Sequence, residues 1–435
     1  MNDTVKNTLL FAGIAILIVG TGFVQSWNSA LLILNMGLIS AIMALGVNLQ
    51  WGFAGLFNTG IMGFVALGGL ASVLISTGPV PEAWPGPAFQ AFGGLILGAI
   101  TMALAVMVWR KMPKGRNRGW AVTAILVLGF ILFRAVFDPA VSVIEANNPA
   151  TSGNIGGFGL PILLSWPLGG VLAAGAAWII GKTALGLRSD YLAIATLGIA
   201  EIVIAVLKNE DWLARGVKNV IGLPRPWPVP LEVNLQQDPA FLERAATIGM
   251  DPTMASTLWV KFLYAILFAV VLVIIFWLSE RARHSPWGRM MRAIRDNETA
   301  AEAMGKDVKR RHLQVFILGS AVCGIAGAMM TSLDGQLTPT SYQPLRFTFL
   351  IWVMVIIGGS GNNLGAVLGG FLIWFLWVQV EPLGVGLMNL ITSGLSEGPL
   401  KTHLIDSAAH MRLFTMGILL LLVLRFSPRG LIPEK

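Results

Sequence analysis

The stretch NETAAEAMGKDVKRRH, residues 297–312, is a polar interruption in a chain that is otherwise strongly apolar. Thr299 and Glu302 have the spacing of a capping box, in which the threonine hydroxyl and the glutamate carboxylate each bond to a free backbone N–H group. Gly305 follows at a position that favours the end of a helix. We therefore expect a helix of one to two turns that begins near Thr299 and ends near Gly305.

The alanines of this stretch, Ala300, Ala301 and Ala303, are strong helix formers. In a helix, Ala300, Ala303 and Met304 lie on one face. A helix this short is not stable alone in water, since most helical stability comes from packing. Two interpretations follow: the helix docks into another protein, or the stretch is an ordinary solvated loop.

The surrounding composition indicates an integral membrane protein. The chain has 435 residues, of which 55% are hydrophobic and 12% are charged, whereas soluble domains contain about 25% charged residues. Apolar runs of about 18 residues or more are candidate membrane helices. We expect an all-α, polytopic bundle. The run 347–380 is broken by GGSGNN at 358–363 and counts as two spans, which gives about twelve, and the range is ten to twelve if some spans are broken or re-entrant. The candidate runs are 8–26, 30–50, 53–76, 91–109, 119–137, 167–187, 190–207, 259–279, 311–333, 347–380 and 411–426.

The distribution of lysine and arginine predicts the orientation of the spans. Basic residues gather at 110–118, at 280–311 and in the tail after 424, and such segments face the cytoplasm. Counting spans between them places both termini inside. The outer loops are then 138–166, 208–258, 334–346 and 381–410. We expect one transmembrane domain over residues 1–435, with its first span retained rather than removed as a signal peptide.

Several function classes are disfavoured. The net charge of +8 fits basic loops at a membrane surface better than nucleic-acid binding. A single cysteine and four scattered histidines predict neither a disulfide nor a metal site. GAAWIIGKT at 175–183 has five residues between its glycines where a phosphate-binding loop needs four. We therefore expect no bound cofactor, no ATP site and no catalytic cluster in this chain.

A few polar residues in apolar runs are candidates for a translocation path. Glu201 is either a functional carboxylate that faces the protein interior or a structural residue near the outer interface, and both interpretations stay open. Asn35, Asn48 and Asn58 either line a path or bond between helices, and the second is favoured. Thr196 is a further path candidate.

The segment SPWGRMMRAIRDNETAAEAMGKDVKRRHLQVFILGSAVCGIAGAMM, residues 285–330, resembles the permease subunits of ABC importers for branched-chain amino acids. The motif of those subunits corresponds here to Ala300–Gly305. Further segments of the chain are similar to the same family, and together they cover most of it from about residue 30. They are 48–69, 187–203, 355–370 and 426–434.

This resemblance implies that residues 299–305 form a coupling helix that sits in a groove of an ATPase subunit. The implied partners are a second homologous permease, two ATP-binding cassette subunits that bind the ATP, and a periplasmic substrate-binding protein, which would contact the outer loop around 216–230. The implied location is the bacterial inner membrane. Branched-chain or related hydrophobic amino acids are the implied substrates. Urea, amides and other amino acids stay open as alternatives, as does an autonomous secondary transporter.

Overall fold

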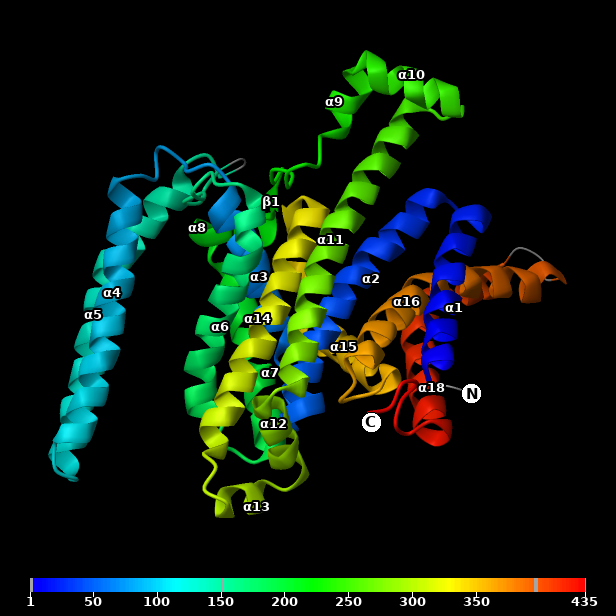
Figure 1. Cartoon of the computed structure of the whole chain (residues 1–435). Helices are drawn as coiled ribbons and strands as arrows, with labels where there is room; N and C mark the ends of the chain where they lie inside the picture. The colour runs from blue at the N-terminus through cyan, green and yellow to red at the C-terminus, as the bar shows by residue number, and fades with distance from the viewer. Residues whose placement is uncertain (1–2, 150–151, 395–397, 435) are drawn as a thin grey trace.

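The computed structural model describes residues 3–149, 152–394 and 398–434, and these are almost entirely helical (Figure 1). Six helices at the centre form what we call the core bundle. They are α2 (Trp27–Val47), α3 (Ile61–Ser76), α6 (Ser165–Ala184), α14 (Val308–Asp334), α15 (Pro344–Gly358) and α16 (Asn363–Ile391). Packed around them are α1 (Asp3–Val24), α7 (Ser189–Asn209), α11 (Pro252–His284), α17 (Pro399–Asp406) and α18 (Met411–Phe426). The predicted all-α fold is confirmed.

Every predicted apolar run contains a helix. Within the described ranges, nine helices are long and apolar enough to cross a membrane, and the bent pair of α17 and α18 makes ten. The run 347–380 divides into α15 and α16, as expected from GGSGNN. The run 53–76 differs from the prediction, because residues 55–60 are irregular and α3 begins only at Ile61. Gly55 there has a φ of +69°, which favours glycine and ends the preceding helix.

Glycines allow the core helices to approach closely. A Cβ atom added to Gly324 of α14 would lie 2.5 Å from the backbone oxygen of Gly169 of α6. A Cβ atom added to Gly319 of α14 would lie 2.5 Å from the backbone oxygen of Gly46 of α2. Small residues at such contacts are the usual means of helix association in membranes. The core bundle therefore depends on backbone-to-backbone packing.

Helices α4 (Gly86–Lys111) and α5 (Arg116–Ala146) form an outlying hairpin beside this bundle (Figure 1). Its contacts with the rest of the chain are concentrated at one end, where the rings of Phe137 and Trp212 lie 5.5 Å apart. Trp84, just before α4, donates from its indole nitrogen to the backbone oxygen of Ile155 at 2.9 Å. Most other side chains of the hairpin are exposed on the single chain.

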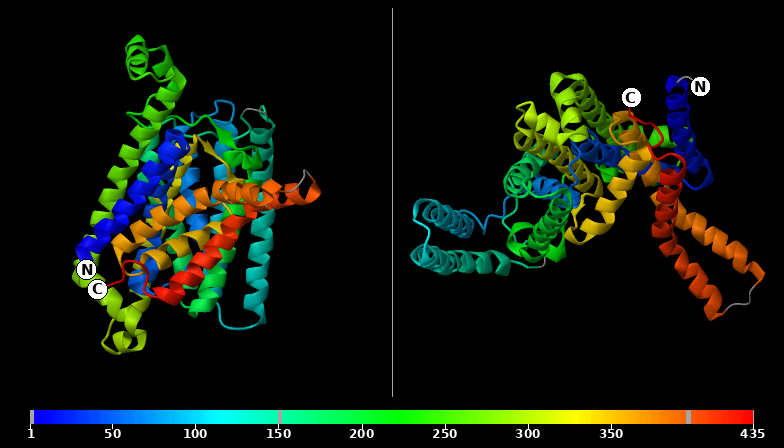
Figure 2. Two further views of the ribbon diagram at one scale, coloured as in Figure 1. Left: turned by 90° about the vertical axis from the view of Figure 1, so that its right-hand side faces the viewer. Right: turned by 90° about the horizontal axis from the view of Figure 1, so that it is seen from below.

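The basic segments gather at one end of the bundle. Helices α12 (Pro286–Asp296) and α13 (Glu298–Ala303) and the α4–α5 connection lie at this end, which we call the basic end (Figure 1). The start of α1 and the end of α18 also lie toward it (Figure 2). This grouping is the one that the positive-inside rule predicts.

The opposite end carries the long loop 208–258, which contains α9 (Glu232–Gln237) and α10 (Pro239–Ile248). Strand β1 (Val220–Ile221) of this loop pairs antiparallel with β2 (Gln336–Leu337), so the predicted outer loops 208–258 and 334–346 do meet. Short elements complete the chain. They are α8 (Asp211–Ala214), η1 (Asn48–Gly52), η2 (Ile162–Leu164), η3 (Gly216–Lys218), η4 (Pro339–Ser341), η5 (Thr392–Gly394) and η6 (Ser407–His410).

Two predicted outer loops are shorter than expected. Helix α5 continues through Pro139 to Ala146, and α16 continues through Pro382 to Ile391. The predicted loops 138–166 and 381–410 therefore begin inside helices. Proline is tolerated in membrane helices because neighbouring groups satisfy the freed backbone carbonyl, so both helices extend beyond the ends of the apolar runs. Residues 150–151 and 395–397 of these loops lie outside the described residues.

Candidate functional site

The helix predicted in the opening stretch is present as α13, but its start differs from the prediction. The side chain of Asn297 accepts a hydrogen bond from the backbone N–H of Ala300 at 2.9 Å and caps the helix. Thr299 lies inside the helix and is exposed. The predicted capping box at Thr299 and Glu302 is therefore wrong. Asparagine is among the strongest N-cap residues, and Asn297 precedes the threonine in extended conformation.

The end of α13 agrees with the prediction. Gly305 has a φ of +75°, and its N–H donates to the backbone oxygen of Glu302 at 2.8 Å. The N–H of Lys306 donates to the backbone oxygen of Ala301 at 3.1 Å. This pair of bonds is a Schellman motif, which ends a helix through a glycine in the left-handed region.

One face of α13 is apolar and uncovered on the single chain. Ala301 is buried against the rest of the protein, whereas Ala300 and Ala303 are exposed. Met304, just after the helix, is 80% exposed. A flexible methionine beside small alanines is a surface that adapts well to a partner. The three residues predicted to share a face, Ala300, Ala303 and Met304, are thus all accessible, as are the polar residues Glu298, Thr299 and Glu302.

Helix α12, which leads into α13, is tied to the core bundle by Arg295. Its guanidinium donates to the backbone oxygen of Gly52 and pairs with Glu434 at 2.8 Å. Arg292 lies 3.9 Å from the same carboxylate. The segment that carries Glu434 also bonds to the turn between α15 and α16, where Asn362 donates to the backbone oxygen of Pro433 at 3.1 Å.

A buried polar network continues from this turn into the core. The Asn48 side chain donates to that of Asn363 at 3.0 Å, and Asn363 donates to Glu280 of α11 at 2.9 Å. The Asn48 side-chain oxygen accepts from the N–H of Gly361 at 2.8 Å. Asn48 and Asn363 are fully buried. The exposed helix α13 is therefore connected through α12 to η1, which extends α2, and through the tail at Pro433 and Glu434 to the turn between α15 and α16. The polar network joins both of these to α11.

Asn58 also bonds between segments of the bundle. Its side chain donates to Gln50 at 2.9 Å, and its backbone oxygen accepts from the indole of Trp352 at 3.0 Å. Gln50 in turn donates to the backbone oxygen of Phe316 at 3.0 Å. For Asn48 and Asn58 the favoured interpretation, bonding between helices, is the one that the structure shows.

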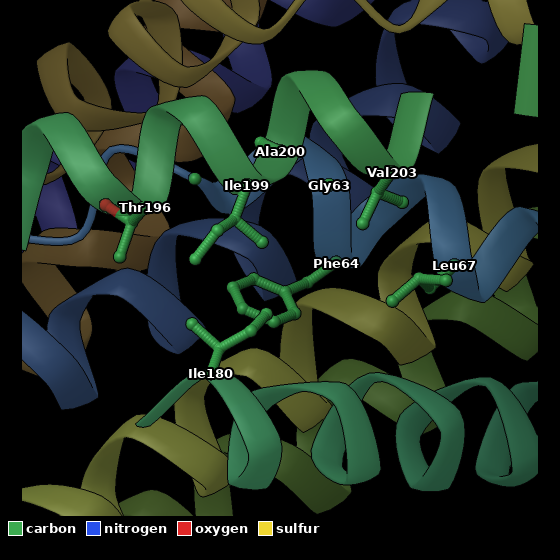
Figure 3. A pocket seen from close by; sticks show the side chains of 9 residues that line it. Gly63, Phe64, Leu67, Ile180, Thr196, Ile199, Ala200 and Val203 are labelled. Carbon is green, nitrogen blue, oxygen red and sulfur yellow. The ribbon is translucent and has the colours of Figure 1, made fainter. Parts of the chain in front are cut away.

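Thr196 lies beside this region, where α3, α6 and α7 meet. Its hydroxyl accepts from the N–H of Thr59 at 3.1 Å and donates to the backbone oxygen of Ala193 at 3.0 Å. Figure 3 shows Phe64, Ile180 and Ile199 converging on the small space between these helices. The space measures about 10 Å³, which is about the least that holds one water molecule.

The remaining path candidates are separate from these. Glu201 is exposed on α7, so the structure does not bring it into the buried cluster of Asn58 and Thr196. Asn35 is buried, and its amide donates to the backbone oxygens of Leu31 and Lys261 at 2.9 Å each. In lipid, an exposed carboxylate in a span is costly unless protein or water covers it.

Sequence reasoning missed Glu280, Arg295 and Glu434 as connecting residues. Each lies in a basic or terminal segment, where a charged residue is usually exposed to solvent. A signal was present for Glu280, which is an isolated carboxylate at the end of an apolar run. Its partner Asn363 is 83 residues away in the chain, so spacing alone could not identify the pair.

A family model for the permease component of branched-chain amino acid transport systems matches residues 118–424. The match covers more than half of the chain, including α12, α13 and four helices of the core bundle. The chain belongs to this family. It is therefore a multi-pass membrane protein of a family of transport components. No solved structure matches it.

Individual relatives agree with this assignment. The permease protein LivM of Escherichia coli (strain K12) is 27% identical over 63% of this chain and 62% of its own length. The probable branched-chain amino acid permease LivM of Methanocaldococcus jannaschii is 26% identical over 91% of this chain and 90% of its own length. The ribose import permease RbsC of Haemophilus influenzae is 27% identical over 60% of this chain. The chain thus spans less than two thirds of the bacterial LivM proteins it matches.

Proposed function

We propose that this chain is a permease subunit of an ABC importer for branched-chain or related hydrophobic amino acids. The observation that carries the proposal is α13, a capped helix outside the bundle whose exposed apolar face has no cover on the single chain. We propose that it docks into an ATP-binding cassette subunit at the basic end, which faces the cytoplasm of a bacterial inner membrane. ATP is bound by two such partner subunits.

The contacts of α12 support a mechanism of alternating access. When the ATPase subunits close, they displace α13. Arg295 and the Asn48–Asn363–Glu280 network pass this displacement to α2, α11 and the turn between α15 and α16. The core helices then rock as packed units and expose the path to the other side. A second homologous permease completes the path. The 216–230 segment at the opposite end receives the periplasmic binding protein.

The docking of α13 can be tested in membrane vesicles that contain the complete transporter. Glu302→Lys combined with Lys306→Glu reverses two exposed charges, and Met304→Asp places a charge on the apolar face. We expect either change to lower amino-acid uptake about tenfold or more, because central interface residues contribute about 2 kcal/mol or more. Membrane insertion stays normal, since none of the three residues is buried.

Arg116→Glu is the matched control, because Arg116 is also exposed at the basic end but is the first residue of α5 and not part of α13. We expect normal uptake from it. Normal uptake and normal ATP consumption per substrate in both test variants would show that α13 is not the docking helix. Uptake by the purified chain alone, without ATP, would instead support an autonomous secondary transporter.

A further inference from the structure

Helices α3 and α15 are too short to cross a membrane unaided. They have 16 and 15 residues, or roughly 23 Å of helix against about 30 Å of hydrocarbon. Each follows short irregular backbone. Before α3 this backbone is largely buried, with Asn58 0% exposed, whereas before α15 Tyr342 is 1% exposed and its neighbours Ser341 and Gln343 are exposed. In transporters, interrupted helices of this kind mark binding sites near the middle of the membrane.

The two short helices contact one another. The backbone N–H of Met62, at the start of α3, donates to the hydroxyl of Thr348 of α15 at 3.4 Å. The indole of Trp352 of α15 donates to Asn58, just before α3, at 3.0 Å. The start of α3 therefore meets the middle of α15 inside the core bundle, although Met62 and Thr348 are 286 positions apart in the chain.

A cavity of about 140 Å³ adjoins this meeting point. Five of the residues that line it are methionines, among them Met62 of α3 and Met354 of α15. One water molecule occupies about 30 Å³ of liquid, so the volume suits a solute of several heavy atoms. It is much larger than the space beside Thr196 that Figure 3 shows.

The polar groups of the cavity are few and differ in kind. Asp334, the last residue of α14, is exposed and lies next to β2, so the cavity opens toward the opposite end of the bundle. Ser40 and Ser341 contribute hydroxyl groups. The indole nitrogen of Trp374 is buried and has no hydrogen-bond partner among the described residues. A buried N–H group without a partner is costly, and a ligand that accepts its hydrogen bond removes the cost.

We propose that this cavity binds the transported solute and that the solute is a zwitterion with an aliphatic side chain. The proposal rests on the permease function proposed above and names its site. The carboxylate of Asp334 pairs with the ammonium group of the solute, and the Trp374 indole donates to its carboxylate. The methionines surround the aliphatic side chain of the solute, since flexible thioethers adapt to branched shapes. A sugar fits poorly, because most of its hydroxyl groups would have no partner in so apolar a cavity.

The test uses the complete transporter with saturating binding protein, in vesicles, with labelled leucine and labelled phenylalanine as probes. Asp334→Asn removes one charge-assisted hydrogen bond, and we expect the maximal rate of leucine uptake to fall about tenfold. Asp334 is exposed, so this variant folds. Met354→Ala enlarges the cavity, and we expect the ratio of phenylalanine uptake to leucine uptake to rise several-fold. A residue with a purely structural role would lower both rates and leave the ratio unchanged.

Met107→Ala is the matched control, because Met107 is exposed on α4 and far from the cavity in sequence and fold. We expect it to change neither rate. If wild-type vesicles take up leucine while Asp334→Asn and Met354→Ala behave as wild type, the solute passes elsewhere and this inference is wrong. If wild-type vesicles take up no aliphatic amino acid but do take up urea or a sugar, the substrate assignment in the proposed function is wrong.

Discussion

The spans of α2 and α4 have the same length and mean hydropathy but occupy opposite environments. The α2 span, extended by η1, and the α4 span each have 26 residues and are equally apolar. In the most apolar part of each span, 78% of the residues are buried in the α2 span but only 22% in the α4 span. Hydropathy therefore identifies which segments enter the membrane, but not whether protein or lipid covers them.

Glycine contacts separate the two regions better than hydropathy does. An added Cβ at Gly46 of α2 would lie 2.8 Å from the backbone oxygen of Gly319. An added Cβ at Gly93 of α4 would meet nothing within 4 Å. The core bundle uses its glycines for close approach between helices, whereas several glycines of the outlying hairpin lie in open space. The experiments below test this distinction, beginning with the largest expected effect.

Gly324→Leu and Gly93→Leu make the same change in the two regions. At Gly324 the new side chain would meet the backbone of Gly169 and the Cβ of Ala173, both at 2.5 Å. We expect the free energy of unfolding to fall by about 3 kcal/mol or more, because backbone cannot move aside as a flexible side chain can. Gly93→Leu should leave stability nearly unchanged. Thermal unfolding of the two purified variants in detergent measures the difference, and equal losses would contradict the role assigned to the glycines.

Asn363→Ala tests whether the buried polar network adds to this packing. The substitution leaves the Glu280 carboxylate and the Asn48 amide without the bonds of 2.9 and 3.0 Å that they now make. We expect a loss of about 1–3 kcal/mol, since the buried Asn48 amide then lacks a partner. The partly exposed Glu280 keeps its ion pair with Arg283 at 3.1 Å. In the hairpin, Gln90 also bonds through its amide, to the backbone oxygen of Val136, but it is exposed.

Gln90→Ala is therefore the matched control for that experiment, and we expect a loss well below 1 kcal/mol, because water can replace an exposed bond. Chemical denaturation of the detergent-solubilised protein compares the two variants. A larger loss at Gln90 than at Asn363 would mean that the hairpin, and not the network, limits stability.

Part of this organisation was predictable from sequence. The alanines and Gly305 predicted α13 and its end, because helix propensity and the left-handed preference of glycine are local properties. The basic segments predicted which loops share an end. The ends of the apolar runs placed the loops 138–166 and 381–410 too early, because α5 and α16 continue through Pro139 and Pro382. Whether a helix continues through a proline depends on neighbouring helices that the local sequence does not reveal.

The cavity and the network could not be predicted, because both depend on residues that only the fold brings together. Asn48 and Asn363 are 315 positions apart. The methionines of the cavity come from α2, α3, α14 and α15, and each reads in sequence as one more apolar residue in a span. Asn58 and Thr196 were recognisable as unusual polar residues, but only their contacts show that they bond between segments of the bundle.

The smallest effect is expected on the uncovered surface of the hairpin. Leu128 of α5 is 62% exposed on the single chain, so lipid or detergent replaces most of what its side chain would contact in a core. We expect Leu128→Ala to lower the free energy of unfolding by about 0.5 kcal/mol, which is the difference in lipid preference between the two side chains. Thermal unfolding of the purified chain measures this loss of stability.

The same variant in the complete transporter shows whether another subunit covers α5, because a partner surface would make uptake fall while the stability of the isolated chain stays normal. A loss above about 2 kcal/mol in the isolated chain, typical of a buried leucine, would place α5 inside a protein core and remove the contrast between the two regions.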